Sequence, residues 1–453
     1  MFGSLANAKV SRRRFLTSSV AGMGTLAGAS ILLDACNTST TSSPGTTTLS
    51  VMYNTGEFTP AYIKQFEQLH PGIKINFIAF DQTRLNAMFA AGTPPDFIRA
   101  SAVGSASTSA RGLALNLDPY LAKSSVLKTS DLLGINNAWR WDGKKVGQGP
   151  YYGITKDWSQ DQTTWYNQDL LEKAGLSALS PTEPITYDQL FTMATKLTTR
   201  KGGKTLVYGY GTQWAWGLII IMMMMVTQQG ASLYNADGTQ VDFTIPEAQK
   251  AVEWFINYEQ AKIGPSSLDP AAAGWDGPDL LANQMTTMMG GYWFGGGYVL
   301  PGSAQNQAQL RLAPAPMMGS TRFSPSGSGV GAWIPASTKH PDEAWALMEY
   351  FMAGQPAHDR AKSGSGIPSL KSLLPELPQA LPFQQEAYQS LQSEIQYVGV
   401  IPDSPYITLA TYNTILQKYI QQAAQNQISL KSACQQITQD ANTAIQQGLQ
   451  QMS

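Results

Sequence analysis

From Thr47 onward, apolar positions follow two periods in turn along the chain. Residues 47–53 and 73–80 alternate between apolar and polar side chains, as strands do. Residues 60–70 instead place apolar side chains three and four positions apart, and residues 84–91 continue as a second helix. This order predicts a βαβα unit at the start of the folded part. Such a unit requires a parallel sheet.

The pattern changes at residues 154–164, which are polar and aromatic and resemble a connection between two parts of the fold. A helix is expected from Thr186, because a Gln stands three positions later in the spacing of a capping box. Residues 218–226 are nine apolar residues in a row. That run is too short to span a bilayer, so it predicts a helix buried in a core.

The second half of the chain is mostly helical in pattern. Residues 285–297 read as a strand that breaks into glycines around aromatic side chains. A strong helix is expected from Pro341, and residues 407–422 and 430–449 are the clearest helical segments near the end. Trp333 and Trp345 lie in apolar patterns that favour core positions.

The N-terminal residues predict export. Arg12 and Arg13 precede a weakly apolar Ala/Gly stretch, as in a twin-arginine signal, and Leu33-Asp-Ala-Cys36 ends it. We expect residues 1–36 to be the signal, Cys36 to carry a lipid, and residues 37–46 to form a flexible linker. A transmembrane anchor is the alternative, although Ala and Gly are poor membrane-spanning residues. Asp34 departs from the small uncharged residue typical of lipoproteins, so lipidation is a weaker expectation than export.

Composition argues against several classes of partner and cofactor. The chain has 30 Lys and Arg against 31 Asp and Glu, and no basic patch, which does not suit nucleic acid. Only three His and two Cys are present, without the close spacing of a zinc site, so we expect no metal and no cofactor. With Cys36 lipidated, Cys434 has no disulfide partner and is expected to be a small buried side chain. Charged residues are only 13% of the chain, and 11 Trp and 19 Tyr are present.

Four segments, taken in order, resemble one known family. They are residues 73–80 with Ala-Gly-Thr-Pro-Pro-Asp at 91–96, Trp-Tyr-Asn from 165 with Leu-Glu-Lys-Ala-Gly-Leu, residues 288–293, and Ala-Pro-Ala-Pro from 313 with Gly-Ala-Trp-Ile-Pro from 331. Together they resemble the extracellular solute-binding proteins of carbohydrate ABC transporters, the maltose- and oligosaccharide-binding group. The resemblance covers the chain from about Thr47.

The resemblance implies an α/β protein with the two-lobed periplasmic-binding-protein fold of type II, each lobe a sheet flanked by helices. Lobe one is then expected at residues 47–158 and 286–335, and lobe two at residues 159–285 and 336–453. The chain would cross between the lobes about three times, and the ligand would bind in the cleft between them. Ligands of such folds sit beyond the carboxyl ends of strands.

Sugars need aromatic platforms and side chains that donate and accept hydrogen bonds. The resemblance makes Trp293 the first candidate to stack on a sugar, while Asp96 is expected to hold its loop. The other candidates for ligand binding are Tyr292, Trp214, Trp216, Asn54, Glu57, Arg99, Ser101, Asp157, Trp158, Gln160 and Gly366. Trp214 and Trp216 could equally serve packing, and Asp157, Trp158, Gln160 and Asp161 could equally solvate a hinge.

The expected function is capture of an extracellular sugar or oligosaccharide by a monomer and its delivery to the membrane subunits of an ABC permease. The protein would be lipid-anchored on the outer face of the cytoplasmic membrane. An exported glycoside hydrolase is an alternative, but no two carboxylates are obviously paired in the sequence. A binding protein for iron or a polyamine is the other alternative. No catalytic residue is assigned.

Overall fold

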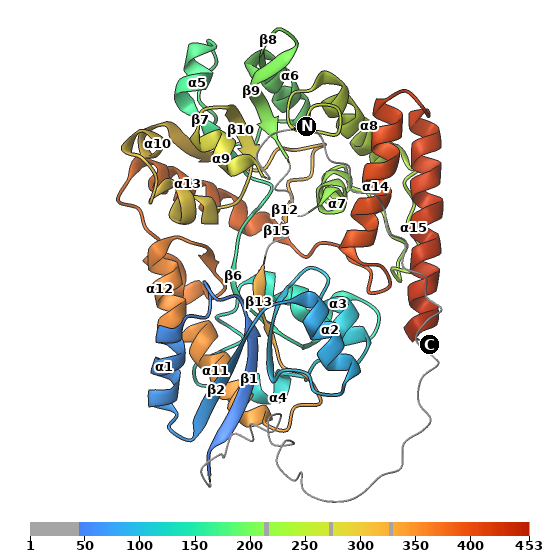
Figure 1. The fold of residues 1–453 in the computed structure, drawn as a ribbon. Coiled ribbons are helices and arrows are strands. Elements are labelled where there is room, and N and C mark those ends of the chain that lie inside the picture. The colour runs from blue at the N-terminus through green and yellow to red at the C-terminus, as the bar shows by residue number, and fades with distance from the viewer. Residues whose placement is uncertain (1–44, 213–216, 271–274, 326–328, 453) are drawn as a thin grey trace, which may run out of the picture. The chain divides into compact units, whose positions relative to one another are not determined.

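The computed structural model describes residues 45–212, 217–270, 275–325 and 329–452, and two sheets organise them (Figure 1). The six-stranded sheet has the spatial order β14 (Ile367–Pro368), β6 (Ile154–Trp158), β13 (Val330–Trp333), β3 (Phe97–Ser101), β1 (Thr47–Tyr53) and β2 (Ile73–Ala79). The five-stranded sheet has the order β11 (Leu310–Ala313), β7 (Thr164–Asn167), β10 (Met285–Met289), β9 (Lys204–Gly211) and β8 (Thr199–Lys201). Two further sheets have two strands each. One pairs β4 (Arg140–Trp141) with β5 (Val146–Tyr151), and the other pairs β12 (Ser324–Pro325) with β15 (Val398–Gly399).

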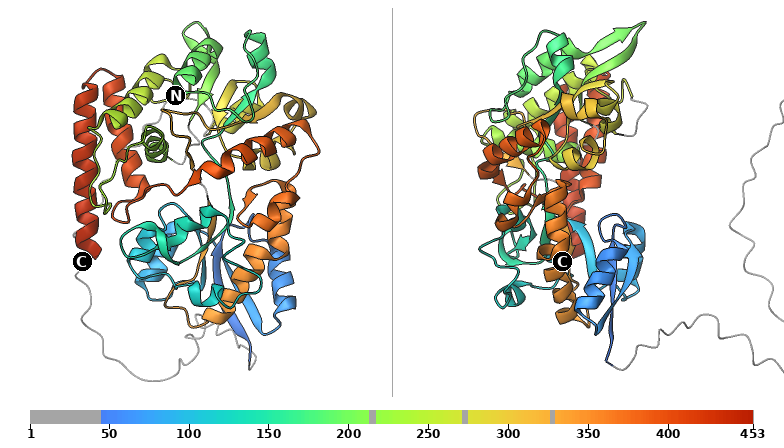
Figure 2. Two further views of the ribbon diagram at one scale, coloured as in Figure 1. Left: turned by 180° about the vertical axis from the view of Figure 1, so that it is seen from behind. Right: turned by 90° about the vertical axis from the view of Figure 1, so that its left-hand side faces the viewer.

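Helices accompany both sheets (Figure 2). With the six-stranded sheet are α1 (Pro60–Leu69), α2 (Gln82–Ala90), α3 (Ala106–Ala110), α4 (Asp118–Leu121), α11 (Pro341–Ala353) and α12 (Gln355–Ser363). With the five-stranded sheet are α5 (Gln168–Lys173), α6 (Tyr187–Leu197), α7 (Leu218–Gln228), α8 (Pro246–Ala261), α9 (Asp276–Leu281), α10 (Ala304–Gln309), α13 (Pro382–Glu394), α14 (Leu409–Ala424) and α15 (Leu430–Met452). Short 3₁₀ turns occupy Gly134–Trp139, Lys371–Glu376 and Ile395–Tyr397, and a π-helical turn occupies Gly295–Val299.

The predicted parallel opening is confirmed. Strand β1 pairs in parallel with β2 along its whole length and with β3 at Val51 and Met52. Strand β13 runs antiparallel to both β3 and β6, so β6 points the same way as β3. The carboxyl ends of β1, β3 and β6 therefore meet at one edge of the sheet.

Period-two burial on β1 explains why helices cover both faces of this sheet. Leu49, Val51 and Tyr53 pack into one core together with residues of α1 and α11, while Met52 faces a second core that contains Trp333. Alternate side chains of a strand point to opposite faces, so both faces carry an apolar layer. The expectation that Trp333 and Trp345 are core residues is confirmed by their burial.

The predicted core helix and capping box are also confirmed. All side chains from Ile219 to Val226 in α7 are buried in one cluster with α8, α14 and α15. At the start of α6, the Gln189 amide donates to Thr186 Oγ1, and the Thr186 amide donates to Gln189 Oε1, so both hydrogen bonds of the capping box are present. Cys434 on α15 is buried in the same cluster, as expected for a small apolar side chain.

The strand pairing differs from the expected division at residues 286–335. Strands β10 and β11 pair with β7 in the five-stranded sheet, and the chain rejoins the six-stranded sheet only at β13. Met285 and Met288 pack against Trp165 of β7, which holds β10 in that sheet. Helices α11 and α12, expected in lobe two, instead pack on the core of the six-stranded sheet.

Among the described residues, three stretches lie between strands or helices of the two sheets: residues 159–163, residues 314–325 with 329, and residues 369–381. The first leads from β6 to β7, the second from β11 to β13, and the third from β14 to α13, which packs against β11. Figure 1 shows the chain rising from the end of β6 toward β7 in the other sheet. This connectivity agrees with the expected number of crossings.

Candidate functional site

A cavity of about 830 Å³ lies between residues of the two sheets. From the side of the six-stranded sheet it is lined by Asn54, Gly56, Glu57, Thr59, Tyr62, Arg99, Lys156, Asp157, Trp158, Val330, Asp359, Arg360, Ser363, Ser365 and Gly366. Trp293 and Tyr298 line it from the segment that follows β10, and Ser159 from the first crossing. We call the first set the charged wall and the pair Trp293 and Tyr298 the aromatic wall.

The charged wall is built where strands end. Asn54 directly follows β1, Arg99 lies near the end of β3, and Lys156 and Asp157 lie near the end of β6. These three strands point the same way, so their last side chains converge at one edge. Gly366 belongs to the adjoining loop, where a Cβ would lie 2.8 Å from that of Asp157, so the close approach requires glycine.

Glu57 is the centre of an ion-pair cluster in this wall. Its carboxylate accepts hydrogen bonds from Arg99 Nε at 3.1 Å and Nη2 at 3.0 Å, and from Asn54 Nδ2 at 3.0 Å. Lys156 Nζ lies 3.5 Å from the same carboxylate. Burial alone would raise the pKa of Glu57, but the Lys156 and Arg99 charges outweigh it and lower the pKa to about 2. Glu57 is therefore ionised.

Asp157 joins this cluster to a second buried cation. Its carboxylate contacts Lys156 Nζ and lies 3.8 Å from Arg360 Nε. Arg360 Nη2 donates to the Phe351 carbonyl at 2.7 Å, and the guanidinium sits over the Phe351 ring at 4.8 Å. Burial lowers the pKa of Arg360, while the Asp157 charge opposes that shift. Three cations thus surround two carboxylates in this part of the wall.

Asp359 is the third carboxylate of the charged wall, and neutral side chains hold it. It accepts hydrogen bonds from the Tyr62 hydroxyl at 3.2 Å and from Gln355 Nε2 at 2.7 Å. Counted over the whole wall, the acidic and basic side chains balance. The wall therefore offers both donors and acceptors without a large net charge.

The aromatic wall comes from a segment that leaves the strand geometry after β10. Gly290 and Gly291 end the strand, and a helical turn then leads into the π-helical turn Gly295–Val299. A Cβ on Gly291 would lie 2.1 Å from Ser159 Oγ, so only glycine lets the first crossing pass this closely. This turn brings Trp293 to the cavity, half-buried, with Nε1 donating to Asp161 Oδ1 at 2.8 Å.

Neighbouring rings fix the aromatic wall. The Trp293 ring centroid lies 6.3 Å from that of Trp275, 5.9 Å from Phe294 and 5.8 Å from Tyr298. Tyr298 also contacts Trp275 edge-on at 5.0 Å and stacks on Phe294 at 5.4 Å. The two lining rings therefore keep their orientation without a ligand.

Many of the residues proposed from the sequence come together here. The predicted residues that line the cavity are Asn54, Glu57, Arg99, Asp157, Trp158, Trp293 and Gly366. Three others do not: Tyr292 is buried in the core, Gln160 is buried in the first crossing, and Ser101 is at the end of β3 outside the lining. Trp214 and Trp216 lie outside the described residues, as does Cys36.

Asp96 takes the role expected of it. Its carboxylate accepts a hydrogen bond from the Ser50 amide at 2.8 Å and from the Thr338 hydroxyl at 2.7 Å. It therefore ties the loop before β3 to its surroundings and does not line the cavity. Asp161 is likewise used within the protein, since it accepts the bond from Trp293.

Sequence reasoning missed several lining residues. Lys156 stands beside the proposed Asp157 on β6, and its position at a strand end could have indicated it. Tyr298 follows a run of glycines, which was a weaker signal. Tyr62, Asp359 and Arg360 lie on helices α1 and α12, and nothing in their local patterns indicates that they reach the cavity.

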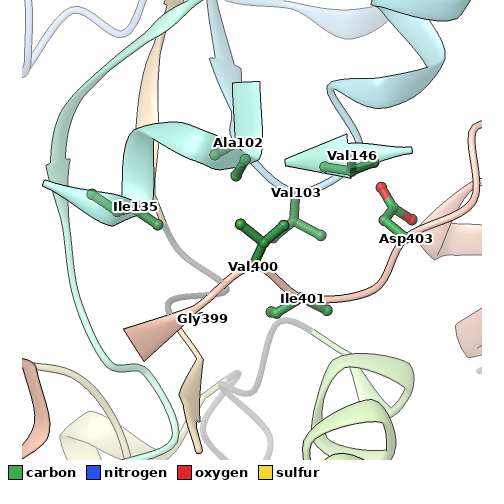
Figure 3. Close-up of a pocket in the computed structure, with 9 residues that line it drawn as sticks. Ala102, Val103, Ile135, Val146, Gly399, Val400, Ile401 and Asp403 are labelled. Carbon is green, nitrogen blue, oxygen red and sulfur yellow. The ribbon is translucent and has the colours of Figure 1, made fainter. Parts of the chain in front are cut away.

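A much smaller cavity, of about 10 Å³, lies beside Asp403 (Figure 3). Apolar side chains surround it, including Val103, Val146 and Val400. Asp403 accepts hydrogen bonds from the Gly104 and Ser404 amides, each at 2.9 Å. These bonds lower the pKa of Asp403, but burial outweighs them and raises it to about 6. The space holds one water at most, so it is not a ligand site.

Two further features bear on function. Among residues 45–452 with their three gaps, no group of three or more His, Cys, Asp or Glu side chains could hold a metal ion. In the same described residues, no helix is long and apolar enough to cross a membrane.

The fold and the cavity define a two-lobed binding protein of the type II periplasmic class, as the sequence predicted. Solved structures share this fold. An ABC substrate-binding protein from Listeria monocytogenes in complex with cycloalternan matches with a TM-score of 0.72 and 19% identity, over 88% of this chain and 98% of that one. The sugar-binding protein MalE from Xanthomonas citri matches with a TM-score of 0.69 and 18% identity, over 88% and 98%. A solute-binding protein from Thermotoga lettingae bound with α-D-tagatose matches with a TM-score of 0.67 and 19% identity, over 88% and 100%.

Residues 52–353, more than half of the chain, match the family described as bacterial extracellular solute-binding protein. The chain belongs to this family. Comparison with curated protein sequences gives no match.

Proposed function

We propose that this protein captures a sugar or oligosaccharide outside the cytoplasm and delivers it to the membrane subunits of an ABC permease. The observation that carries the proposal is the pairing of an aromatic wall with a wall of hydrogen-bonding charged groups around one cavity. Sugars present an apolar ring face and a rim of hydroxyls, which these two surfaces complement. The structural neighbours named above are described as binding cycloalternan, sugar and tagatose, which supports this ligand class.

Each wall has its own part in binding. Trp293 stacks on a pyranose face, and Asn54, Glu57, Arg99 and Asp157 exchange hydrogen bonds with hydroxyl groups. Trp158 is itself buried and donates its Nε1 proton to the Pro368 carbonyl at 3.1 Å, so it shapes the cavity floor. Gly366 lets its loop approach the same floor.

Ligand capture involves closure of the two lobes about the crossings. The sheets divide the lobes differently from the sequence expectation. We assign lobe one to residues 47–158 with 330–368, and lobe two to residues 164–313 with 382–452. Closure desolvates the ligand between both walls and produces the form that the permease recognises. Small-angle scattering should show a smaller radius of gyration at saturating ligand, and an unchanged radius would contradict closure.

The rival functions fit the cavity less well. A glycoside hydrolase needs a carboxylic acid that stays protonated near neutral pH, whereas the cations beside Glu57 lower its pKa to about 2. A polyamine site needs uncompensated acids, but the acids and bases lining this cavity balance. For an iron site, no group of three or more His, Cys, Asp or Glu side chains that could hold a metal ion occurs in the described part of the chain. No catalytic activity is therefore assigned.

The location follows from the N-terminal sequence and from the family. We infer export by the twin-arginine route, removal of the signal before Cys36, and a lipid anchor on Cys36 at the outer face of the cytoplasmic membrane. These residues lie outside the described part of the chain. Replacing Cys36 with Ser should move the exported protein from the membrane to the soluble fraction, and continued membrane retention would contradict the anchor.

Thermal shift measurements test the binding function directly. Purified protein is heated with mono-, di- and oligosaccharides, and with spermidine and ferric ion as comparison ligands. At least one saccharide should raise the melting temperature, because a ligand that binds only the folded state stabilises it. Stabilisation by spermidine or ferric ion alone, or release of sugar from an oligosaccharide, would contradict the proposal.

A further inference from the structure

Tyr298 stands out because it is an exposed aromatic side chain at the cavity. It is 41% exposed, although it lines the cavity together with Trp293. An accessible Tyr ring beside a ligand cavity offers a ligand both an apolar face and a polar hydroxyl. Its hydroxyl has no hydrogen-bond partner in the described part of the chain, and it remains available to a ligand.

The local backbone presents this ring. Tyr298 lies in the π-helical turn Gly295–Val299, a conformation that is rare and frequent at functional sites. Next to it, Gly297 has no heavy atom within 4 Å of where its Cβ would be. Among the described residues, the space beside Gly297 is therefore open, and the neighbouring Tyr298 side chain is itself largely accessible to a ligand.

The rings beneath Tyr298 hold it in place. Phe294 stacks on it at 5.4 Å with an interplanar angle of 14°, and Trp275 meets it edge-on at 5.0 Å. A platform that is already fixed loses little conformational entropy on binding. Tyr298 is thus a preorganised surface rather than a loosely attached side chain.

The angle between the two lining rings carries the inference. The planes of Trp293 and Tyr298 meet at 75°, and their centroids are 5.8 Å apart. One flat pyranose ring cannot lie on both faces at this angle, so a saccharide that used both faces would need a second sugar unit. The cavity volume of about 830 Å³ is also near the upper end for small-ligand sites, which run to roughly 1,000 Å³.

We propose that Tyr298 forms a second stacking subsite, and that the ligand is an oligosaccharide of at least two units whose successive rings turn relative to each other. This inference rests on the proposed function, since it assumes a saccharide in the cavity. One unit lies on Trp293 and the next on Tyr298. A monosaccharide would then use only the first of these surfaces.

Isothermal titration calorimetry on the full-length exported protein tests this assignment. The probes are the malto-, cello- and manno-oligosaccharide series from one to four units. The wild type should bind longer members more tightly than the shortest member that binds. Tyr298→Ala should weaken binding of the longest member by about tenfold, as expected for one aromatic contact, and of the shortest by less than about threefold. Trp293→Ala should weaken both.

Two further variants act as controls. Leu300→Ala changes a side chain of the same segment that is 37% exposed but does not line the cavity, and should leave both affinities unchanged. Tyr298→Phe keeps the ring and should retain most of the length dependence. Because the comparison is a ratio of two affinities of one variant, a general loss of stability does not imitate it.

The outcomes separate this inference from the proposed function. If Tyr298→Ala weakens the shortest and longest saccharides equally, or changes neither, the second subsite is wrong while sugar binding stands. Wild-type affinity that does not rise with length would also overturn it. If no saccharide binds the wild type, the proposed function itself is wrong.

Discussion

The two walls of the cavity are held in place by different physical means. The charged wall stands on the carboxyl ends of β1, β3 and β6, and ion pairs among its own side chains fix it. The aromatic wall stands on a glycine-rich turn beyond β10, and packing between rings fixes it. One wall is thus preorganised by electrostatics and the other by van der Waals contact.

This difference has a consequence for binding. Glu57, Arg99 and Lys156 already pair with one another, so a ligand that binds them must share or replace existing contacts, and the net gain from each is modest. Stacking of a sugar on an aromatic ring instead adds apolar contact at the ring face, and Trp293 and Tyr298 both line the cavity. Affinity should therefore depend on the aromatic wall, and stability and selectivity on the charged wall. The predictions below test this division.

The largest expected effect is on stability, from Glu57→Gln in the charged wall. Removing one member of a buried ion cluster leaves Arg99 without its paired anion and Lys156 with Asp157 alone, which should cost about 3 kcal/mol of unfolding free energy at pH 7. The pKa of Glu57 in the folded protein is about 2, below the ordinary value of 4.5. Its contribution is therefore complete above about pH 4.5 and is lost as the pH falls toward 2.

Urea unfolding of the wild type and of Glu57→Gln at pH 7 and pH 3 measures the difference between their unfolding free energies. This difference should be smaller at pH 3. Asp359→Asn is the matched control, because Asp359 lines the same cavity but is held by Tyr62 and Gln355 and not by a cation. It should cost about 1 kcal/mol. An equal loss in both variants would show that the cation cluster is not what stabilises this wall.

The next effect is on affinity, from Trp293→Ala in the aromatic wall. Loss of a stacking Trp should cost about 2 kcal/mol of binding free energy, or roughly thirtyfold in affinity. Trp293→Phe should recover much of this, because it keeps a ring while losing only the hydrogen bond to Asp161. Calorimetry with the tightest saccharide from the thermal screen measures both variants.

Trp275→Ala is the control for this prediction. Trp275 contacts the Trp293 and Tyr298 rings but does not line the cavity. If it weakens binding as much as Trp293→Ala, the Trp293 ring acts through packing and not by touching the sugar. The unfolding free energy of each ligand-free variant, measured alongside, separates loss of packing from loss of ligand contact.

The two walls also differ in how well the sequence predicted them. Asn54 and Glu57 could be named because they follow the first predicted strand, where the resembling family contacts its ligand, and Arg99 because it lies just beyond Asp96. Asp157 was named for its place at the expected crossing between the lobes. Arg360 could not be named, because it reaches the cavity only through the packing of α12 against a sheet in which β1, β2, β3 and β6 lie some 200 to 300 residues earlier in the chain.

The aromatic wall was predicted by its motif more than by its geometry. Residues 285–297 were expected to form a strand that breaks into glycines, and the strand does end at Met289; the helical turn that follows was not predicted. Successive side chains in a turn do not point to alternate sides as they do in a strand. The position of each side chain after Met289 therefore depends on the turn, in which Tyr292 is buried and Trp293 reaches the cavity. Tyr298 depends on a π-helical turn, which hydrophobic periodicity does not reveal.

The smallest expected effect comes from Asp403, a carboxyl group whose surroundings are the opposite of those of Glu57. It lies in an apolar environment without a cation beside it, and Tyr234 and Tyr412 are the titratable side chains that sense its charge. Burial raises its pKa to about 6, although the amides of Gly104 and Ser404 donate to it. Because the unfolded chain releases this proton near pH 4, the folded state binds more protons between the two values. Stability from this group therefore falls as the pH rises.

From pH 5 to pH 7 this loss amounts to about 1 kcal/mol for a group with these two pKa values. The Asn side chain of Asp403→Asn cannot ionise, so the variant does not suffer this loss. The unfolding free energy of the variant minus that of the wild type should therefore rise by about the same amount between pH 5 and pH 7. The variant also loses one acceptor, which lowers its stability at every pH and leaves the slope unaffected. Denaturant unfolding at pH 5, 6 and 7 measures the difference. A constant difference would mean that Asp403 titrates normally, and that the contrast with Glu57 does not arise from the presence or absence of neighbouring cations.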